Sequence, residues 1–136
     1  MSRYVLDAFS LLALIQDEPG ASKVQEILDG ASKGKHELYI SVINLGEIIY
    51  TLWGRRGISA AEQALAGLNQ LPITSIDVDR TLVFRAAALK GSYRLHYADC
   101  FVGALAQQTG ATVLTGDPHF RQVEQFIPVE WLPSPE

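Results

Sequence analysis

Short apolar runs alternate with longer stretches of helical periodicity, and this alternation constrains the fold more than any other feature of the sequence. Parallel strands cannot be joined by a tight turn, so a helix between successive strands favours a parallel sheet with helices over both faces. The sequence therefore predicts an α/β domain. The expected strands cover residues 4–6, 38–41, 73–76, 112–114 and, at an edge, 129–132. The expected helices cover residues 8–16, 21–31, 42–53, 59–71, 80–90, 97–109 and 117–125.

The composition is that of one ordered domain. Hydrophobic residues make up 48% of the 136 residues and charged residues 19%, which argues against a disordered chain. No repeat, low-complexity segment or linker interrupts the pattern. We therefore expect a single domain over residues 1–132, followed by a frayed tail at residues 133–136. A domain of this length buries roughly two thirds of the surface that its unfolded chain exposes.

The sequence also bears on location and on thiol chemistry. No apolar run reaches the ~18 residues of a membrane helix, and the N-terminus lacks a basic segment followed by a hydrophobic core. We expect a soluble cytoplasmic protein that makes no membrane contact. The single cysteine, Cys100, excludes an internal disulfide and a multi-cysteine zinc site, and we expect a small buried side chain there.

The charge balance gives no overall attraction for nucleic acid, because the net charge is −4 and the pI is near 5.3. Contacts to an anionic partner must therefore come from local basic groups. These groups are Arg55 with Arg56; Arg80, Arg85, Lys90 and Arg94; and Lys33, Lys35 and His36. The alternative interpretation is that each group is an ordinary solvated helix surface.

Four acids stand in apolar surroundings. Asp7 ends the first predicted strand and Asp117 follows the fourth, while Glu47 is the only charged residue between positions 38 and 54. Asp99 is the only formally charged residue between positions 95 and 116. An isolated carboxylate in such surroundings is strongly disfavoured unless it is paired, hydrogen-bonded or bound to a metal ion.

Each acid also has a purely structural interpretation. Asp7 and Asp117 are placed to cap helices, Asp99 can complement a helix dipole, and Glu47 can pair with an arginine. For Asp7, we expect capping to compete with full ligation of a metal ion by the same carboxylate. These alternatives stay open for each acid taken alone.

Taken together, the acids indicate a metal site. Ligands of open α/β sheets bind beyond the carboxyl ends of the strands, where all four acids can converge. Clustered carboxylates suit Mg²⁺ or Mn²⁺. At an effective dielectric constant near 20, two charges about 4 Å apart repel by roughly 4 kcal/mol, so without metal we expect raised pKa values.

Four motifs in this order resemble the PIN domain, and specifically the VapC-like ribonuclease toxins of toxin–antitoxin pairs. The motifs are Val5-Leu6-Asp7, Asn44-Leu45-Gly46-Glu47, His96-Tyr97-Ala98-Asp99 and Leu114-Thr115-Gly116-Asp117-Pro118-His119-Phe120. The resemblance covers essentially the whole chain. It implies a three-layer α/β/α sandwich with a central, mainly parallel sheet, in which these four acids are the catalytic residues. It also matches Thr115 to the family's hydroxyl near the last acid.

Two positions depart from the usual family pattern. Phe9 stands where Ser or Asn is common two residues after the first acid, and Ser10 follows one position later. Ser10 is therefore the remaining candidate, with Thr115, to support the acids. Cys100 stands where alanine or another small residue is usual, which is a conservative change in a packed helix.

The activity that the resemblance implies is metal-dependent hydrolysis of RNA phosphodiester bonds. Asp7, Asp99 and Asp117 are expected to hold Mg²⁺ or Mn²⁺ directly or through water, and Glu47 to add a ligand or orient the attacking water. Two other classes stay open: a non-catalytic binding module on the same fold, and a phosphotransfer domain with an aspartate acceptor. The second lacks its Asp-x-Asp pattern at residues 7–9, and no Gly-rich nucleotide-binding fingerprint occurs.

The resemblance further implies macromolecular partners. These are an RNA substrate, a cognate antitoxin whose C-terminal segment wraps the toxin, and a second copy in a homodimer or toxin–antitoxin hetero-oligomer. The predicted helical hairpin over residues 44–71, which carries Trp53, is the candidate receptor for an amphipathic segment. Its alternative is an ordinary core face. The RNA-contact candidates are Arg55, Arg56, Arg85 and Arg94.

Overall fold

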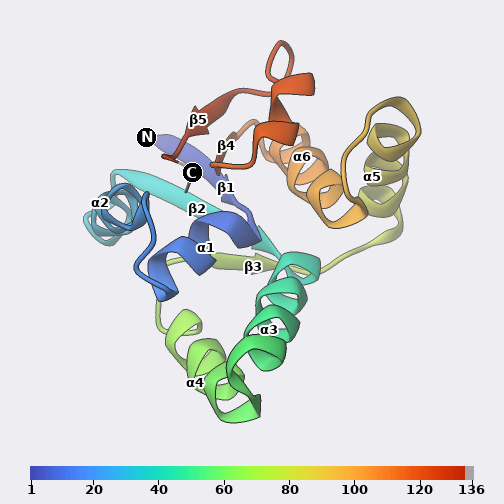
Figure 1. The fold of residues 1–136 in the computed structure, drawn as a ribbon. Helices are drawn as coiled ribbons and strands as arrows, with labels where there is room; N and C mark the ends of the chain where they lie inside the picture. Colours follow the sequence, from blue (N-terminus) through green and yellow to red (C-terminus); the bar gives the residue numbers. More distant parts are fainter. Residues whose placement is uncertain (134–136) are drawn as a thin grey trace.

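The computed structural model describes residues 1–133 and contains one five-stranded sheet (Figure 1). All four strand pairings are parallel, and the strand order is β3-β2-β1-β4-β5. The strands are β1 (Ser2–Leu6), β2 (His36–Ser41), β3 (Thr74–Ile76), β4 (Thr112–Thr115) and β5 (Val129–Trp131). The expected α/β class and parallel sheet are thus confirmed.

Six α-helices and one 3₁₀ helix connect these strands. They are α1 (Ala8–Ile15), α2 (Ala21–Ser32), α3 (Val42–Arg56), α4 (Ile58–Leu68), α5 (Arg80–Ser92), α6 (Tyr97–Thr109) and η1 (Pro118–Gln122). None of the helices in the described part of the chain is long and apolar enough to cross a membrane.

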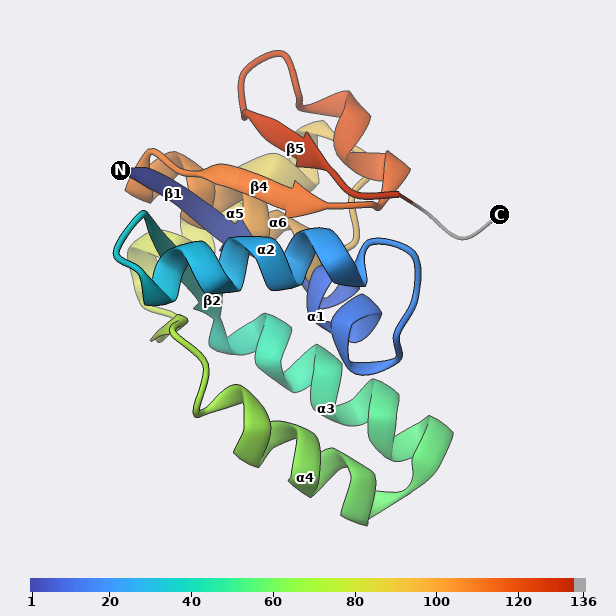
Figure 2. The ribbon, with the colours of Figure 1, turned by 90° about the vertical axis from the view of Figure 1, so that its left-hand side faces the viewer.

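Two cores make the domain three layers deep. Successive residues of a strand point to opposite faces, so Val5 and Val113 join the core under α5 and α6, whereas Leu6 and Leu114 join the core under α1 to α4. All four are fully buried, as expected for a parallel sheet covered on both faces. Figures 1 and 2 show α5 and α6 on one side of the sheet and α1 and α2 on the other, with the α3–α4 hairpin extending from the body.

Local signals in the sequence place most element boundaries. Asp79 caps α5 by accepting a hydrogen bond from Leu82 N at 2.8 Å, and Gly110 ends α6 with a left-handed φ of 68°. Cys100 is fully buried, as predicted. Of the expected tail, residues 134–136 lie outside the described residues.

The helix expected over residues 117–125 is the element that differs most. The structure has a 3₁₀ helix there that ends at Gln122. Phe120 and Val123 are both fully buried, and their backbone N–H groups donate to Asp117 O at 3.2 Å and Phe120 O at 3.1 Å, which is the i→i+3 pattern of a 3₁₀ helix. The chain then turns back toward β5, with Ile127 N donating to Val123 O at 2.8 Å.

Candidate active site at the carboxyl edge of the sheet

The four predicted acids lie on elements that meet at one edge of the sheet. Asp7 directly follows β1 and Asp117 follows β4, its parallel neighbour. Glu47 lies in the second turn of α3, which begins directly after β2, and Asp99 lies in the first turn of α6. Because β2, β1 and β4 are adjacent and parallel, their carboxyl ends share this edge.

Asp7 is buried, with a side chain only 1% exposed, and it does cap a helix. Its Oδ1 accepts a hydrogen bond from Ser10 N at 2.9 Å at the start of α1. Its Oδ2 accepts a short hydrogen bond from the hydroxyl of Thr115. The Ser10 hydroxyl donates to the backbone oxygen of Asp7 at 2.8 Å and so supports the same turn.

Thr115 links the first acid to the last. Besides donating to Asp7, its Oγ1 accepts a hydrogen bond from Asp117 N at 3.0 Å. The Asp117 carboxylate caps η1: its Oδ1 accepts from His119 N at 2.9 Å and lies 2.8 Å from the Nδ1 of the same histidine. One buried hydroxyl thus fixes the relative position of two acids from different strands.

The four acids lie close enough for their charges to affect one another's pKa values. Burial, together with the charges of Asp7, Asp117 and Glu47, raises the pKa of Asp99 to about 8. Burial likewise raises the pKa of Asp7 to about 7, against the opposing effect of its hydrogen bonds.

Glu47 also interacts electrostatically with the other acids. Burial raises its pKa and so does Asp117, whereas a hydrogen bond from Asn44 and the nearby His96 oppose the shift. Each of the carboxylates with a raised pKa therefore responds to at least one other member of the set.

The donor chemistry of this set fits a divalent cation such as Mg²⁺ or Mn²⁺. Carboxylate and hydroxyl oxygens are the ligands that these ions prefer, and a cation would relieve the repulsion that raises the pKa of Asp99. Within residues 1–133, however, no three His, Cys, Asp or Glu side chains converge closely enough to form a complete ligand group. The carboxylates of Asp7 and Asp117 accept hydrogen bonds from Ser10, Thr115 and His119.

Asn44 supports the site although sequence reasoning did not select it. It is fully buried, and its Nδ2 donates to Glu47 Oε1 at 3.3 Å and to the backbone oxygen of Ala98 at 3.1 Å. Ser41 donates to its Oδ1 at 2.9 Å. Asn44 thereby joins α3 to the first turn of α6, beside two of the acids. Its sequence signals are its place at the start of the motif Asn44-Leu45-Gly46-Glu47 and its polarity within an apolar helix start.

Gln122 is a second residue that the sequence did not reveal. Its amide pairs with the backbone of Arg94, accepting from the N–H at 2.9 Å and donating to the carbonyl at 3.1 Å. It also donates to His119 O at 3.1 Å. These bonds tie η1 to the segment before α6, where the His96 and His119 rings pack edge to face at 5.7 Å.

The four arginine candidates do not form one group. Arg94 lies beside η1 through Gln122, and Arg55 lies at the end of α3, where its Nη1 donates to Gln16 Oε1 at 3.3 Å. Arg56 and Arg85 are exposed, and neither contacts the acids in the part of the chain that the structure describes.

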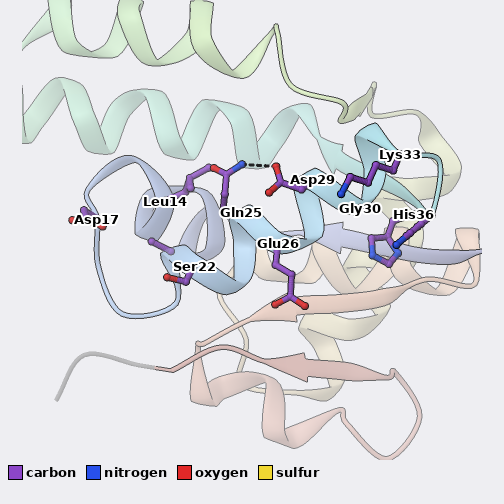
Figure 3. Close-up of a pocket in the computed structure, with 11 residues that line it drawn as sticks. Leu14, Asp17, Ser22, Gln25, Glu26, Asp29, Gly30, Lys33 and His36 are labelled. Atoms are coloured by element: carbon purple, nitrogen blue, oxygen red, sulfur yellow. Dashed lines mark hydrogen bonds between the residues drawn. The ribbon is translucent and has the colours of Figure 1, made fainter.

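A cavity of about 690 Å³ lies away from the four acids (Figure 3). It runs along α2 and ends at His36, which begins β2 and therefore marks the opposite end of that strand from α3. The lining contains none of the four acids, so this cavity is separate from the site described here.

Comparison with known proteins places these observations in a family. The family model described as PIN domain matches residues 4–125. A search of curated protein sequences found no match.

Solved structures share the whole fold. VapBC2 from Rickettsia felis, bound to a DNA fragment from its promoter, is 18% identical with a TM-score of 0.77, covering 96% of this chain and 99% of that one. VapC20 of Mycobacterium tuberculosis, a Sarcin-Ricin loop cleaving toxin, is 18% identical with a TM-score of 0.74, covering 97% and 100%. DNA-bound VapBC from Salmonella typhimurium is 19% identical with a TM-score of 0.74, covering 96% and 98%. At these identities the likeness establishes the fold.

Proposed function

Because the chain belongs to the PIN domain family, we propose that it is a ribonuclease that uses Mg²⁺ or Mn²⁺ to hydrolyse RNA phosphodiester bonds. We further propose that it is the toxin of a toxin–antitoxin pair and inhibits translation or growth. The observation that carries the proposal is that Asp7, Glu47, Asp99 and Asp117 lie on elements that meet at one edge of the sheet, where burial and mutual repulsion raise the pKa of Asp7 and Asp99.

The proposed roles follow from where each acid lies. Asp7, Asp99 and Asp117 would hold the ion directly or through water, and Glu47 would add a ligand or orient the attacking water. The bound ion supplies positive charge that lowers the pKa of a water molecule and offsets the charge that develops on the phosphate.

Neutral side chains keep the acids in place. The Thr115 hydroxyl holds Asp7 and the backbone of Asp117, and Asn44 holds Glu47 against the start of α6. Because these groups carry no positive charge, they position the carboxylates without replacing the cation as the counter-charge.

The partners that we propose are an antitoxin and a second copy of the chain. Two of the similar structures are VapBC assemblies bound to DNA, which supports a protein partner for this fold. Along the α3–α4 hairpin, Tyr50 is 66% exposed, Trp53 53% and Ile58 49%. Trp53 is therefore not a core residue. We propose that this apolar surface receives an amphipathic segment of the antitoxin.

Purified protein incubated with RNA, with and without Mg²⁺ or Mn²⁺, tests the activity. We expect cleavage only with the metal ion, and we expect Asp7→Asn and Asp99→Asn to abolish it while the far-UV circular dichroism stays native. Asp77→Asn, an exposed acid outside the site, serves as the control that keeps activity. A wild-type protein that binds its partner but never cleaves RNA would instead support the non-catalytic binding module.

Expression tests the biological role. We expect the chain alone to arrest growth and co-expression with the protein of the neighbouring gene to relieve the arrest. Trp53→Glu should keep RNA cleavage but lose this relief, because a charge would then stand in the apolar surface of α3. Harmless expression of an active wild-type enzyme would argue against the toxin role.

A further inference from the structure

A small cavity of about 190 Å³ lies between α1 and the end of α3. It is lined by Phe9, Leu12, Ala13, Glu18 and Arg55. The α1 side chains form an apolar floor, whereas the carboxylate and the guanidinium lie at the rim. None of these side chains belongs to the four-acid site, and this combination is unusual for a packing defect because its charged groups face the same space.

Phe9 places this cavity next to the acids. Its ring packs on Gly116 so closely that a Cβ at position 116 would lie 2.3 Å from Cε1 and 2.6 Å from Cζ. Gly116 is the residue between Thr115 and Asp117. Phe9 therefore both lines the cavity and packs on the backbone between two residues of the acid site.

Gln16 links the two charged side chains of the cavity, Arg55 and Glu18, through hydrogen bonds. Arg55 Nη1 donates to Gln16 Oε1 at 3.3 Å, and Gln16 Nε2 donates to Glu18 Oε1 at 2.9 Å. A guanidinium has five N–H donors and a carboxylate accepts at both oxygens, so each retains capacity for a ligand. The rim thus presents donors and acceptors side by side next to an aromatic surface.

We propose that this cavity is a base subsite for the RNA substrate and that it takes an unpaired guanine flanking the cleaved bond. The inference rests on the proposed ribonuclease function. Phe9 would stack on the base, as aromatic side chains do with unpaired RNA. Guanine presents the acceptors O6 and N7, which suit Arg55, and N–H donors on its Watson–Crick edge, which suit Glu18.

The size of the cavity agrees with a single base. At about 190 Å³ it is smaller than the roughly 300–1,000 Å³ of pockets that hold a whole small-molecule ligand. An apolar side chain of a protein partner could fill the floor, but it would leave the guanidinium and the carboxylate at the rim without a role. The charged rim therefore favours a base over a protein side chain.

Short unpaired RNA oligonucleotides that carry each of the four bases at every position near the cleaved bond test the subsite. We expect the wild-type protein to prefer guanine at one position by about tenfold in kcat/KM, the range of one bidentate base contact. Phe9→Leu keeps an apolar contact on Gly116 but removes the ring, and should raise KM about tenfold with little change in kcat. Phe9→Tyr should restore KM.

Two further variants separate recognition from packing. Arg55→Gln should lower cleavage of the guanine substrate most, so that the guanine preference flattens. Phe84→Ala, which removes an exposed aromatic ring on α5, should change neither value. Equal cleavage of all four bases by the wild type, or an unchanged preference in both Phe9→Leu and Arg55→Gln, would overturn the subsite.

Binding without cleavage keeps this test independent of the proposed activity. Fluorescence anisotropy with the Asp99→Asn variant should show the same guanine preference. Cleavage without any base preference would refute the base subsite but support the ribonuclease activity. A guanine preference in binding, with no cleavage by the wild type, would refute the ribonuclease activity but support the base subsite. If Phe9→Leu weakens only the complex with the antitoxin, the occupant is protein and the base subsite is wrong.

Discussion

The repulsion within the acid site makes a quantitative prediction about stability. The Asp99 carboxyl has a pKa of about 8 in the folded protein against an ordinary value of 3.8. Ionisation of a group with a raised folded-state pKa opposes folding. The folded state therefore binds more protons than the unfolded state between about pH 4 and pH 8, and stability must fall as pH rises through this window.

The magnitude follows from the size of the shift. Four pKa units correspond to at most roughly 6 kcal/mol of lost stability above pH 8, of which about 4 kcal/mol is already lost at pH 7. These values are upper limits, because the neighbouring carboxylates share the same protons. Even half of this loss is a large part of the 5–15 kcal/mol that stabilises a typical domain. Asp99→Asn removes the ionisation and should therefore be more stable than the wild type at pH 8 in the absence of metal.

Thermal unfolding followed by circular dichroism in EDTA, at several pH values between 5 and 8.5, measures the effect. The wild-type Tm should fall by about 10 °C or more across the window, whereas Asp99→Asn should lose much less. The exposed Asp77→Asn variant should follow the wild type. Millimolar Mg²⁺ or Mn²⁺ should raise the wild-type Tm most at high pH and that of Asp99→Asn little. A wild-type Tm that is constant or rises with pH, or an identical fall in Asp99→Asn, would refute the reasoning.

Three substitutions test the contacts that support the acids. Thr115→Val leaves Oδ2 of the buried Asp7 carboxylate without its donor and should cost about 1–3 kcal/mol in urea denaturation and most of the RNA cleavage, whereas Thr115→Ser should retain both. Gly116→Ala should lower stability in urea denaturation because its Cβ would overlap the Phe9 ring, and adding Phe9→Ala should recover part of that loss; equal stability of the two variants would disprove the clash. Gln122→Ala removes the pairing with the backbone before α6 and should lower cleavage most at limiting metal concentration, with full recovery at saturating metal.

The sequence predicted the elements well because their signals are local. Apolar runs, caps and glycine stops placed all five strands and all six α-helices within a few residues. The placement of the four acids on elements that meet at one edge followed from topology, since parallel strands that alternate with helices end at the same edge; the role of the acids as ligands stays a prediction. At residues 117–125 the predicted short helix is present with Asp117 as its cap, but it is a 3₁₀ helix and ends at Gln122 instead of Gln125.

The supporting residues could not be read from the sequence for the same reason. Asn44 reaches the backbone of a residue 54 positions away, and Gln122 pairs with a residue 28 positions away. Neither contact has a local signature, because an asparagine or glutamine in a helix is common and its partner depends on packing. The sequence also could not predict whether Trp53 is exposed, since the same spacing of apolar residues suits a core face or a docking surface.

The two interpretations of Asp7, helix cap and metal ligand, need not compete. The hydrogen bond that caps α1 uses Oδ1, whereas the Thr115 hydroxyl holds Oδ2. A hydroxyl can rotate to another acceptor far more readily than a helix N–H can, so a cation can approach Oδ2 while the cap stays intact. Asp117 follows the same arrangement, since both contacts from His119 go to its Oδ1. Each of these acids would then give one oxygen to the backbone and one to the ion, which explains why capping positions at the ends of strands are suitable places for ligands.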